Sequence, residues 1–129
     1  SSTMTHAESA EVVAAIGAAN INAGSGAWIV HPNDGATLAA TSKDSGSGTF
    51  VYENGTILGR RVIESIHASE GTAYYGVFSN FIIGFFGALD LVVDPYSNAS
   101  TGRINITASQ LVDMNVRHAQ AFNVVTLTA

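Results

Sequence analysis

The longest alternating pattern of apolar and polar residues runs from Gly102 to Phe122. Apolar side chains occupy the even positions from Ile104 to Val116, with only Gln110 breaking the run, and Leu111 is the one large apolar side chain at an odd position. Alternation with a period of two predicts a strand with one buried and one solvated face. About 14 residues of strand span roughly 46 Å, more than a small compact domain needs. We therefore expect something outside the domain to use the extra length.

The first third of the chain predicts two helices with a strand between them. Thr5 to Ile21 carries an apolar stripe at helical spacing, and Thr5 and Glu8 have the spacing of a capping box. Ala27 to Val30 is a short apolar run typical of a buried strand. The pair His31-Pro32 predicts the start of a weaker second helix, with His31 as N-cap, and this helix ends near Lys43.

The rest of the chain predicts strands separated by turns. Phe50 to Tyr52 and Thr56 to Leu58 flank Asn54-Gly55, which is a strong short-range signal for a hairpin. Further strands are predicted at Val62–Ile66, Tyr74–Phe78, Phe81–Phe86, Leu89–Val93 and Asn123–Thr128, with turns at Ser79-Asn80 and Gly87-Ala88. Helices that precede a series of strands indicate the α+β class.

The most apolar segment is Phe81 to Phe86. A run of this kind is most simply explained as part of the core. The alternative is a strand that is shared with a neighbouring subunit, since an exposed apolar edge strand would promote aggregation.

The composition points toward an assembly. Hydrophobic residues make up 47% of the 129 residues, whereas charged residues make up 12%, against about 25% in typical soluble domains. So few charges suit a subunit that hides part of its surface against other subunits. The alternative is a monomer whose surface is rich in Ser, Thr and Asn.

Charge and the remaining composition exclude several classes of partner. The net charge is −5 and the five basic residues form no patch in the sequence, so we expect no direct nucleic-acid binding. There is no cysteine, and no apolar run is long enough for a membrane-spanning helix, so we expect no disulfide and no membrane partner. Residue 1 is Ser and the start does not resemble a signal peptide, so we expect a processed or excised piece.

Few residues are candidates for catalysis or metal binding. Glu64 and His67 have the Glu-x-x-His spacing of carboxylate metal sites, but in the predicted strand they point to opposite faces. Asp90 and Asp94 are the one pair that invites an acid and base reading. We therefore predict no catalytic residue, no metal and no cofactor. A small hydrolase or ligand-binding β module remains an alternative, and it would have to use these four residues.

Five segments in order carry a family resemblance. They are AWIVHP, SKDSGSGTF, ILGRRVIES, YYGVFSNFIIG, and the long strand followed by Gln120-Ala121-Phe122. Their order and spacing resemble the C-terminal part of the tailed-phage major capsid (major head) protein family, over nearly the whole chain from about Glu11.

The resemblance implies an α+β fold of the phage major capsid protein type. Residues 1–101 would form an axial-type domain with two helices and a mixed or antiparallel sheet. Residues 102–129 would be a long C-terminal strand pair, belonging to a peripheral domain without its spine helix. The N-terminal arm and the extended loop of the family would also be missing.

This arrangement makes specific demands on the long strand. Its near half would pair within the axial domain, and its far half, from about Gln110, would pair with the last strand. Val112, Met114 and Val116 would then face a depleted core, and would be exposed or covered by a neighbouring chain.

The resemblance also implies a function. The chain would belong to a structural subunit of a bacteriophage or prophage capsid, made in the bacterial cytoplasm and located in the virion. Its partners would be copies of itself, in pentamers and hexamers that enclose the DNA genome. An alternative within the same fold is the shell protein of an encapsulin-like nanocompartment. The Lys43–Gly59 segment would point toward the capsomer axis. The candidate subunit contacts are Lys43, Asp44, Phe50, Tyr52, Asn54, Arg60, Arg61, Phe85 and Phe86.

Overall fold

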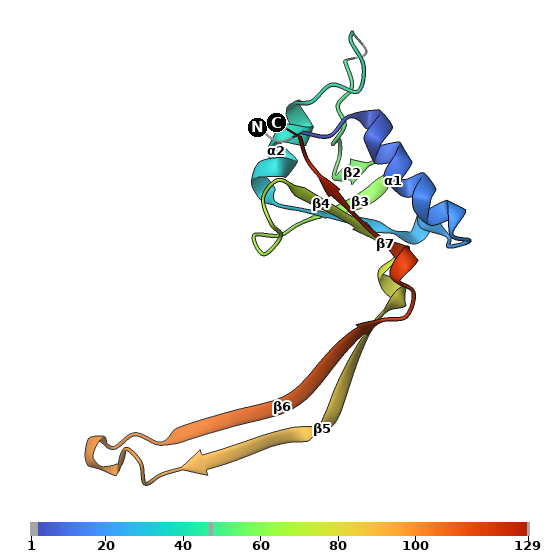
Figure 1. The fold of residues 1–129 in the computed structure, drawn as a ribbon. Coiled ribbons are helices and arrows are strands. Elements are labelled where there is room, and N and C mark those ends of the chain that lie inside the picture. Colours follow the sequence, from blue (N-terminus) through green and yellow to red (C-terminus); the bar gives the residue numbers. More distant parts are fainter. Residues whose placement is uncertain (1–2, 47, 129) are drawn as a thin grey trace. The chain divides into compact units, whose positions relative to one another are not determined.

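The structure, a computed structural model, describes residues 3–46 and 48–128 and divides into two compact units (Figure 1). The first unit combines the described residues up to Asn80 with those from His118 onward, and the second unit is Phe81–Arg117. Ser47, in the predicted polar loop, lies outside the described residues.

The first unit is built on a five-stranded mixed sheet. Its strand order is β2-β3-β1-β4-β7, with β1 parallel to β3 and the other neighbouring pairs antiparallel. The strand bounds are β1 Ala27–Val30, β2 Thr56–Ile57, β3 Arg60–Glu64, β4 Thr72–Gly76 and β7 Phe122–Thr126. The α+β class with two helices and a mixed sheet is confirmed.

Both helices begin at the residues that the sequence predicts. Helix α1 (His6–Ala18) starts with the complete capping box, because the Glu8 N–H donates to the Thr5 hydroxyl and the Glu8 carboxylate accepts the Thr5 N–H at 2.7 Å. Helix α2 (Pro32–Ala40) has Pro32 in its first turn, and the His31 ring nitrogen Nδ1 accepts the Asn33 N–H.

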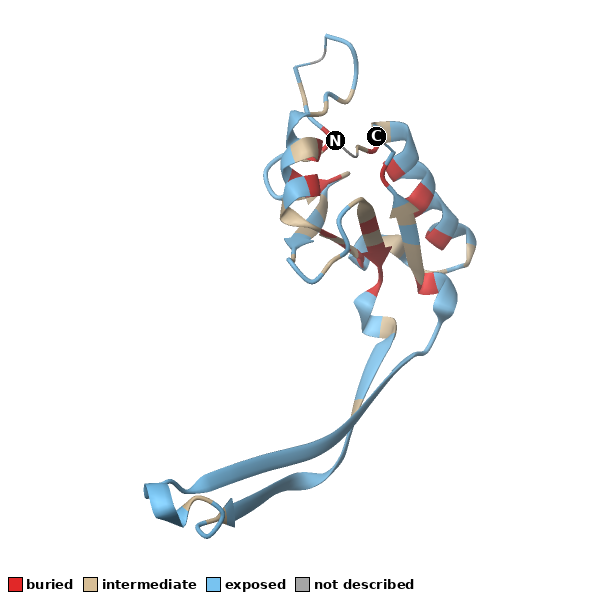
Figure 2. Cartoon of the chain, turned by 60° about the vertical axis from the view of Figure 1, so that its left-hand side comes forward, coloured by how far each residue is buried: buried red, intermediate tan, exposed pale blue. Residues whose placement is uncertain are grey.

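The core of the first unit lies between the helices and the sheet, as the red segments in Figure 2 show. Trp28 at its centre is fully buried and packs against Tyr75, with ring centroids 4.7 Å apart. The other buried apolar side chains are Met4, Val12, Val13, Ile16, Val30, Leu38, Val51, Ile57, Ala73, Val77, Ala121 and Leu127. The last strand packs against this core through the partly buried side chains of Phe122 and Val125, and β7 pairs with β4 over its whole length.

The second unit is one long antiparallel hairpin. Strand β5 (Phe81–Asp94) pairs with β6 (Asn105–Val116), and a short 3₁₀ turn (Ala99–Thr101) lies in the connection. Asp94 begins this connection by accepting the N–H groups of Tyr96 and Ser97. The predicted long strand is therefore confirmed.

The prediction for its partner is wrong. The long strand pairs with β5 along its length, and the last strand pairs with β4 in the other unit. The expected boundary at residue 102 consequently does not coincide with the division into units, which separates residues 81–117 from the rest. The physical reason is that β5 is long enough to satisfy the hydrogen-bonding groups along one edge of the long strand. Strand β7 can therefore pair with β4, at the edge of the five-stranded sheet.

Two predicted turns also differ from the structure. Gly87-Ala88 is not a turn between two strands. It lies within β5, where Gly87 has φ +76° and the pairing shifts register. Asn54-Gly55 does form a tight turn with positive φ at both residues, closed by the Glu53–Thr56 bridge, but Phe50–Tyr52 is no strand and β2 pairs with β3 instead.

The capping box gives a first test of this fold. Substituting Thr5→Ala removes the hydroxyl that accepts the Glu8 N–H, so the free energy of unfolding should fall by about 1 kcal/mol, whereas Thr5→Ser should change it little. Denaturant unfolding followed by the fluorescence of Trp28, the one tryptophan of the chain, measures both. An equal loss in both variants would contradict the cap.

The same motif has a pH signature. Hydrogen bonds from the Thr5 N–H and then the Thr5 hydroxyl lower the pKa of Glu8. A lowered folded-state pKa contributes stability that is present above about pH 4.3, the ordinary value for Glu, and is lost as the pH falls through the folded-state pKa. Thermal melts at pH 7 and below pH 4 measure this effect. Between these two pH values the melting temperature of the Glu8→Gln variant should fall less than that of the unchanged protein.

Candidate assembly surfaces

The register of the hairpin sorts its side chains onto two unlike faces. Residues directly opposite in an antiparallel pair share a face, so the pairs Phe81–Val116, Ile83–Met114 and Phe85–Val112 lie on one side. We call this side the apolar face. Its members are Phe81, Ile83, Phe85, Leu91 and Val93 of β5 with Ile106, Ala108, Gln110, Val112, Met114 and Val116 of β6. Gln110 is the one polar member.

A bulge in β5 preserves this arrangement. Phe86 pairs with Leu111 and Asp90 pairs with Ser109, so residues 87–89 lie opposite Gln110 alone. Two extra residues are an even number, and side chains alternate with a period of two. Odd-numbered residues of β5 therefore stay on the apolar face on both sides of the bulge. A single extra residue would have turned Leu91 and Val93 to the other side.

The apolar face is exposed throughout in the described chain. Its nine large side chains have exposed fractions between 36% for Val116 and 67% for Phe85. Figure 2 shows nearly the whole hairpin in the colour of exposed residues. Contiguous apolar surface of this extent marks a contact with another chain or segment.

This exposure settles two expectations. Val112, Met114 and Val116 are 51%, 59% and 36% exposed, which confirms that they do not face a core within this chain. The simpler expectation for Phe81–Phe86, a place in the core, is wrong. These residues lie in a two-stranded sheet, and two strands alone have no second layer against which to bury them.

The opposite face of the hairpin is mixed. It carries Asp90, Asp94, Asp113 and several neutral polar side chains, together with the exposed apolar side chains of Ile82, Phe86, Val92 and Leu111. Phe85 and Phe86, predicted together as contacts, therefore lie on opposite faces. The sequence held a signal for this, because both aspartates of β5 fall at even positions.

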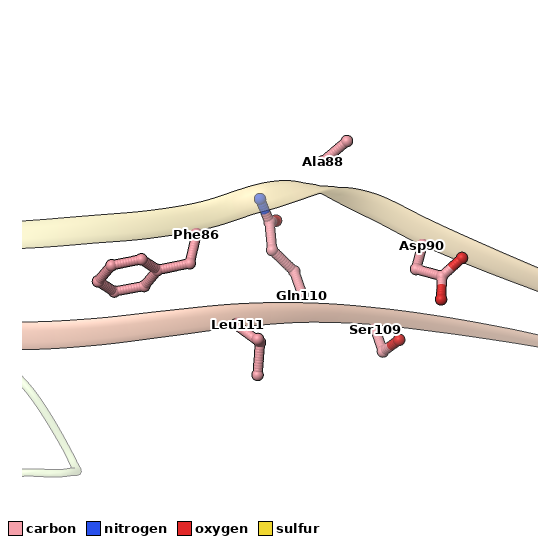
Figure 3. A pocket seen from close by; sticks show the side chains of 6 residues that line it. All are labelled: Phe86, Ala88, Asp90, Ser109, Gln110 and Leu111. Atoms are coloured by element: carbon pink, nitrogen blue, oxygen red, sulfur yellow. The ribbon is translucent and has the colours of Figure 1, made fainter.

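A hollow of about 240 Å³ lies at the bulge (Figure 3). Phe86, Asp90, Ser109 and Leu111 line it on the mixed side, while Gln110 and Ala88 point to the other side. Asp90 is its only ionisable side chain. A hollow with one carboxylate and no second titratable group offers no acid and base pair.

The predicted contacts in the first unit divide into side chains that support the fold and side chains that lie at the surface. The Arg60 guanidinium donates to the carbonyl oxygens of Ala23 and Leu58, at 3.3 and 2.9 Å. Tyr52 donates its hydroxyl to Glu64 at 2.8 Å, and this hydrogen bond, with burial, raises the pKa of Tyr52. Both residues therefore support the fold from within.

The other predicted contacts of the first unit lie closer to solvent. Phe50 is 39% exposed, Asn54 occupies the tight turn, and Arg61 and Asp44 are exposed. Lys43 forms an ion pair with Glu53, with 3.8 Å between Nζ and Oε2. An exposed pair of this kind contributes little to stability.

The catalytic candidates are divided between the two units. Glu64 and His67 lie in the first unit, and Asp90 and Asp94 lie in the second. The Glu64 carboxylate accepts the Tyr52 hydroxyl, and Asp94 accepts from Ser97 and Tyr96, which lowers the pKa of Asp94. Within the described residues no three His, Asp or Glu side chains gather in a way that could hold a metal ion. No helix among the residues described is long and apolar enough to span a membrane.

Comparison with known proteins finds similarity to phage capsid proteins. The sequence profile described as the Phage capsid family matches residues 2–127. A curated relative, the major capsid protein of Halomonas phage phiHAP-1, is 24% identical over 117 residues, which are 91% of this chain and 19% of that protein. The chain thus spans about a fifth of the length of this relative.

Solved structures share the fold. The capsid of an empty GTA particle matches with a TM-score of 0.73 at 17% identity, covering 93% of this chain and 42% of that one. A virus-like particle from Pyrococcus furiosus matches with a TM-score of 0.61 at 16% identity, covering 96% of this chain and 55% of that one.

The two neighbouring arginines provide a matched test of the structural assignment. Arg60→Ala should lower the free energy of unfolding by about 1–2 kcal/mol, because it removes two charge-assisted hydrogen bonds to backbone carbonyls. Arg61→Ala should change it by less than about 0.5 kcal/mol. Denaturant unfolding followed by Trp28 fluorescence distinguishes them. Equal losses would show that Arg60 is not a structural residue.

The two faces of the hairpin provide a second test. Replacing Ile83 and Phe85 by Thr retains strand propensity but removes two large side chains of the apolar face, so concentration-dependent association of the chain should decrease. The matched control replaces Ile82 and Val92 of the mixed face by Thr. Sedimentation velocity measures association. A larger decrease in the control would refute the assignment of the apolar face.

Proposed function

Since this chain belongs to the phage capsid family, we propose that it is part of the structural subunit of a bacteriophage or prophage capsid. Copies of the complete subunit assemble into pentamers and hexamers that enclose the DNA genome, and its place is the virion. The observation that carries the proposal beyond family membership is the exposed apolar face of the β5–β6 hairpin.

The physical argument starts from the instability of a lone hairpin. An isolated two-stranded hairpin is only marginally stable in water, and this one exposes nine large apolar side chains on one side. At about half exposure each, they offer roughly 800 Å² of apolar surface, the share of one partner in a standard protein interface. A further segment of the same protein or a neighbouring subunit would cover this surface.

The two units correspond to parts of the family fold. The five-stranded unit is the axial-type domain, and it includes the last strand, β7. The hairpin belongs to the peripheral-type domain. In this proposal the segment Lys43–Gly59 points toward the symmetry axis of the capsomer, where the exposed side chains of Phe50 and Asn54 are available for contacts.

The subunit has a structural role without catalysis or cofactor. The four candidate acids and bases are divided between two units. The Glu64 carboxylate accepts a hydrogen bond from the Tyr52 hydroxyl, and the Asp94 carboxylate accepts one from the Tyr96 N–H, so both serve local hydrogen bonds. A net charge of −5 disfavours tight binding to the phosphates of packed DNA. The principal partners are therefore copies of the same protein.

No observation specifically supports either alternative function, the nanocompartment shell or the small hydrolase or binding module. The fold is shared with capsids and with the virus-like particle, so the fold does not distinguish a nanocompartment from a phage shell. The curated relative, a phage major capsid protein, favours the phage. A small hydrolase or binding module would need a polar pocket with several titratable groups, and the hollow at the bulge has one.

Electron microscopy of the complete gene product tests the proposal. Closed shells are expected, and Met114→Asp should abolish them, because it places a charge within the apolar face. The neighbouring variant Asn115→Asp adds the same charge on the mixed face and should leave the shells. Only soluble monomers under every assembly condition, or shells that tolerate Met114→Asp, would count against the proposal.

A further inference from the structure

Within the described residues no strand pairs with the outer edge of β6, and the backbone groups that face this edge alternate along the strand. The N–H groups of Met114 and Val116 are accepted at 2.8 Å by the side chains of their own preceding residues, Asp113 and Asn115. These N–H groups therefore point away from β5. Because outward and inward groups alternate in an antiparallel pair, the even-numbered residues of β6 all present N–H and C=O to the outer edge.

Only part of this edge is open. Asp113 and Asn115 occupy the outward N–H groups at the C-terminal end, and the turn at Gly102, with φ +66°, bounds the N-terminal end. Within β6 the open segment runs from Asn105 to Val112. Its midpoint lies close to Ala108, and every residue in it is exposed.

The corresponding edge of β5 is less suited to pairing. Its bulge between Phe86 and Asp90 interrupts the even spacing of outward groups, as bulges on edge strands commonly do. Strand β6 has no such interruption over Asn105–Val116. A strand that adds to this hairpin therefore adds to β6.

Charge selects the partner and the register. When a second copy of β6 lies antiparallel about a two-fold axis through Ala108, Arg103 of one copy lies opposite Asp113 of the other, twice per pair. Both are odd-numbered; Asp113 lies on the mixed face, and Arg103 lies in the connection, two residues before β6 begins. Among two-fold registers centred on the open segment, this is the one that places opposite charges across the edge, and its centre lies close to the midpoint of that segment.

We propose that two copies of this protein pair along the outer edges of β6, antiparallel about a two-fold axis at Ala108, so that two hairpins become one four-stranded sheet. This inference deepens the proposed capsid function and rests on it. The interface is isologous, and the added contact is β-augmentation. Even residues pair with even residues, so the two apolar faces join into one continuous surface.

The side-chain pairs in this register are compatible. Thr107 lies opposite Ser109 of the other copy, and Ile104 lies opposite Val112. Ile106 lies opposite Gln110, the one polar residue of the apolar face, and Ala108 meets its own counterpart. The small side chain at the two-fold axis allows the close approach.

Single cysteines test the pairing, because these 129 residues contain no cysteine that could compete with an introduced one. In the complete gene product, Ala108→Cys should form a disulfide-linked dimer under mild oxidation, since Cα atoms of hydrogen-bonded antiparallel pairs are about 5.5 Å apart. Val92→Cys is the matched control, exposed on the same hairpin but on β5, three strand spacings from its counterpart. We expect roughly tenfold more dimer from Ala108→Cys.

Charge exchange tests the register. In the Ala108→Cys background, Arg103→Asp and Asp113→Arg each place like charges opposite one another and should lower the dimer yield by about two- to tenfold, and combining them should restore it. Asp113→Asn keeps an acceptor for the Met114 N–H but removes the charge, so it should fall between the wild type and Asp113→Arg. Trp28 fluorescence confirms that each variant is folded.

The outcomes separate this inference from the proposed function. Shells with no excess of Ala108→Cys dimer over the control overturn the strand pairing and leave the capsid role standing. Cross-linked dimers whose yield is restored in the double charge variant, without shells, support the pairing and count against the capsid role. A dimer yield that is the same in the charge variants as in the Ala108→Cys background overturns the register centred on Ala108.

Discussion

The rest of the hairpin depends on the parity of the register between β5 and β6. Side chains alternate between faces with a period of two, so any odd shift in pairing would move half of the apolar side chains to the polar side. The shift between Phe86 and Asp90 is even, and Leu91 and Val93 stay in line with Ile83 and Phe85. A face about 11 residue positions long therefore survives a bulge that also bends the strand. The exposed surface for assembly follows from this single constraint.

Much of the fold could be predicted from local sequence signals. The capping box at Thr5 and Glu8 and the start of α2 at Pro32 are local in origin, and both appear in the structure as predicted. The alternation from Ile104 to Val116 likewise predicted a long strand, because such a pattern can be recognised within one strand without knowing its partner. Local chemistry decides these features, and no tertiary information was required.

Pairing partners could not be predicted in the same way. The long strand had two candidate partners, and choosing between them depends on the lengths of the strands and on loop closure, which a pattern within one strand does not contain. The glycine at position 87 favours positive φ equally in a turn and in a bulge, so the sequence did not distinguish them. Both errors moved β7 into the wrong unit, although its own bounds were nearly correct.

The contact residues show the same division between local and non-local information. Arg60 and Arg61 are neighbours with the same charge, and only the position of the carbonyls of Ala23 and Leu58 makes one structural and the other free. Phe85 and Phe86 were separable in principle, because the aspartates at positions 90 and 94 mark the even side of β5 as polar. The bulge hid this signal, since a predicted turn at that point would have broken the alternation.

An apolar face of this size creates a conflict between assembly and aggregation, and the hairpin manages that conflict at its edges. Apolar burial is non-directional and would hold two hairpins together in many registers. Hydrogen-bonded edges are directional, but an unbroken edge pairs with any strand. In this hairpin the bulge disrupts the β5 edge, and the side chains of Asp113 and Asn115 occupy two N–H groups of the β6 edge. What remains open is short and flanked by opposite charges. In the proposed edge pairing, specificity would come from these polar atoms, while the joined apolar faces would remain open to the further cover that the proposed function requires.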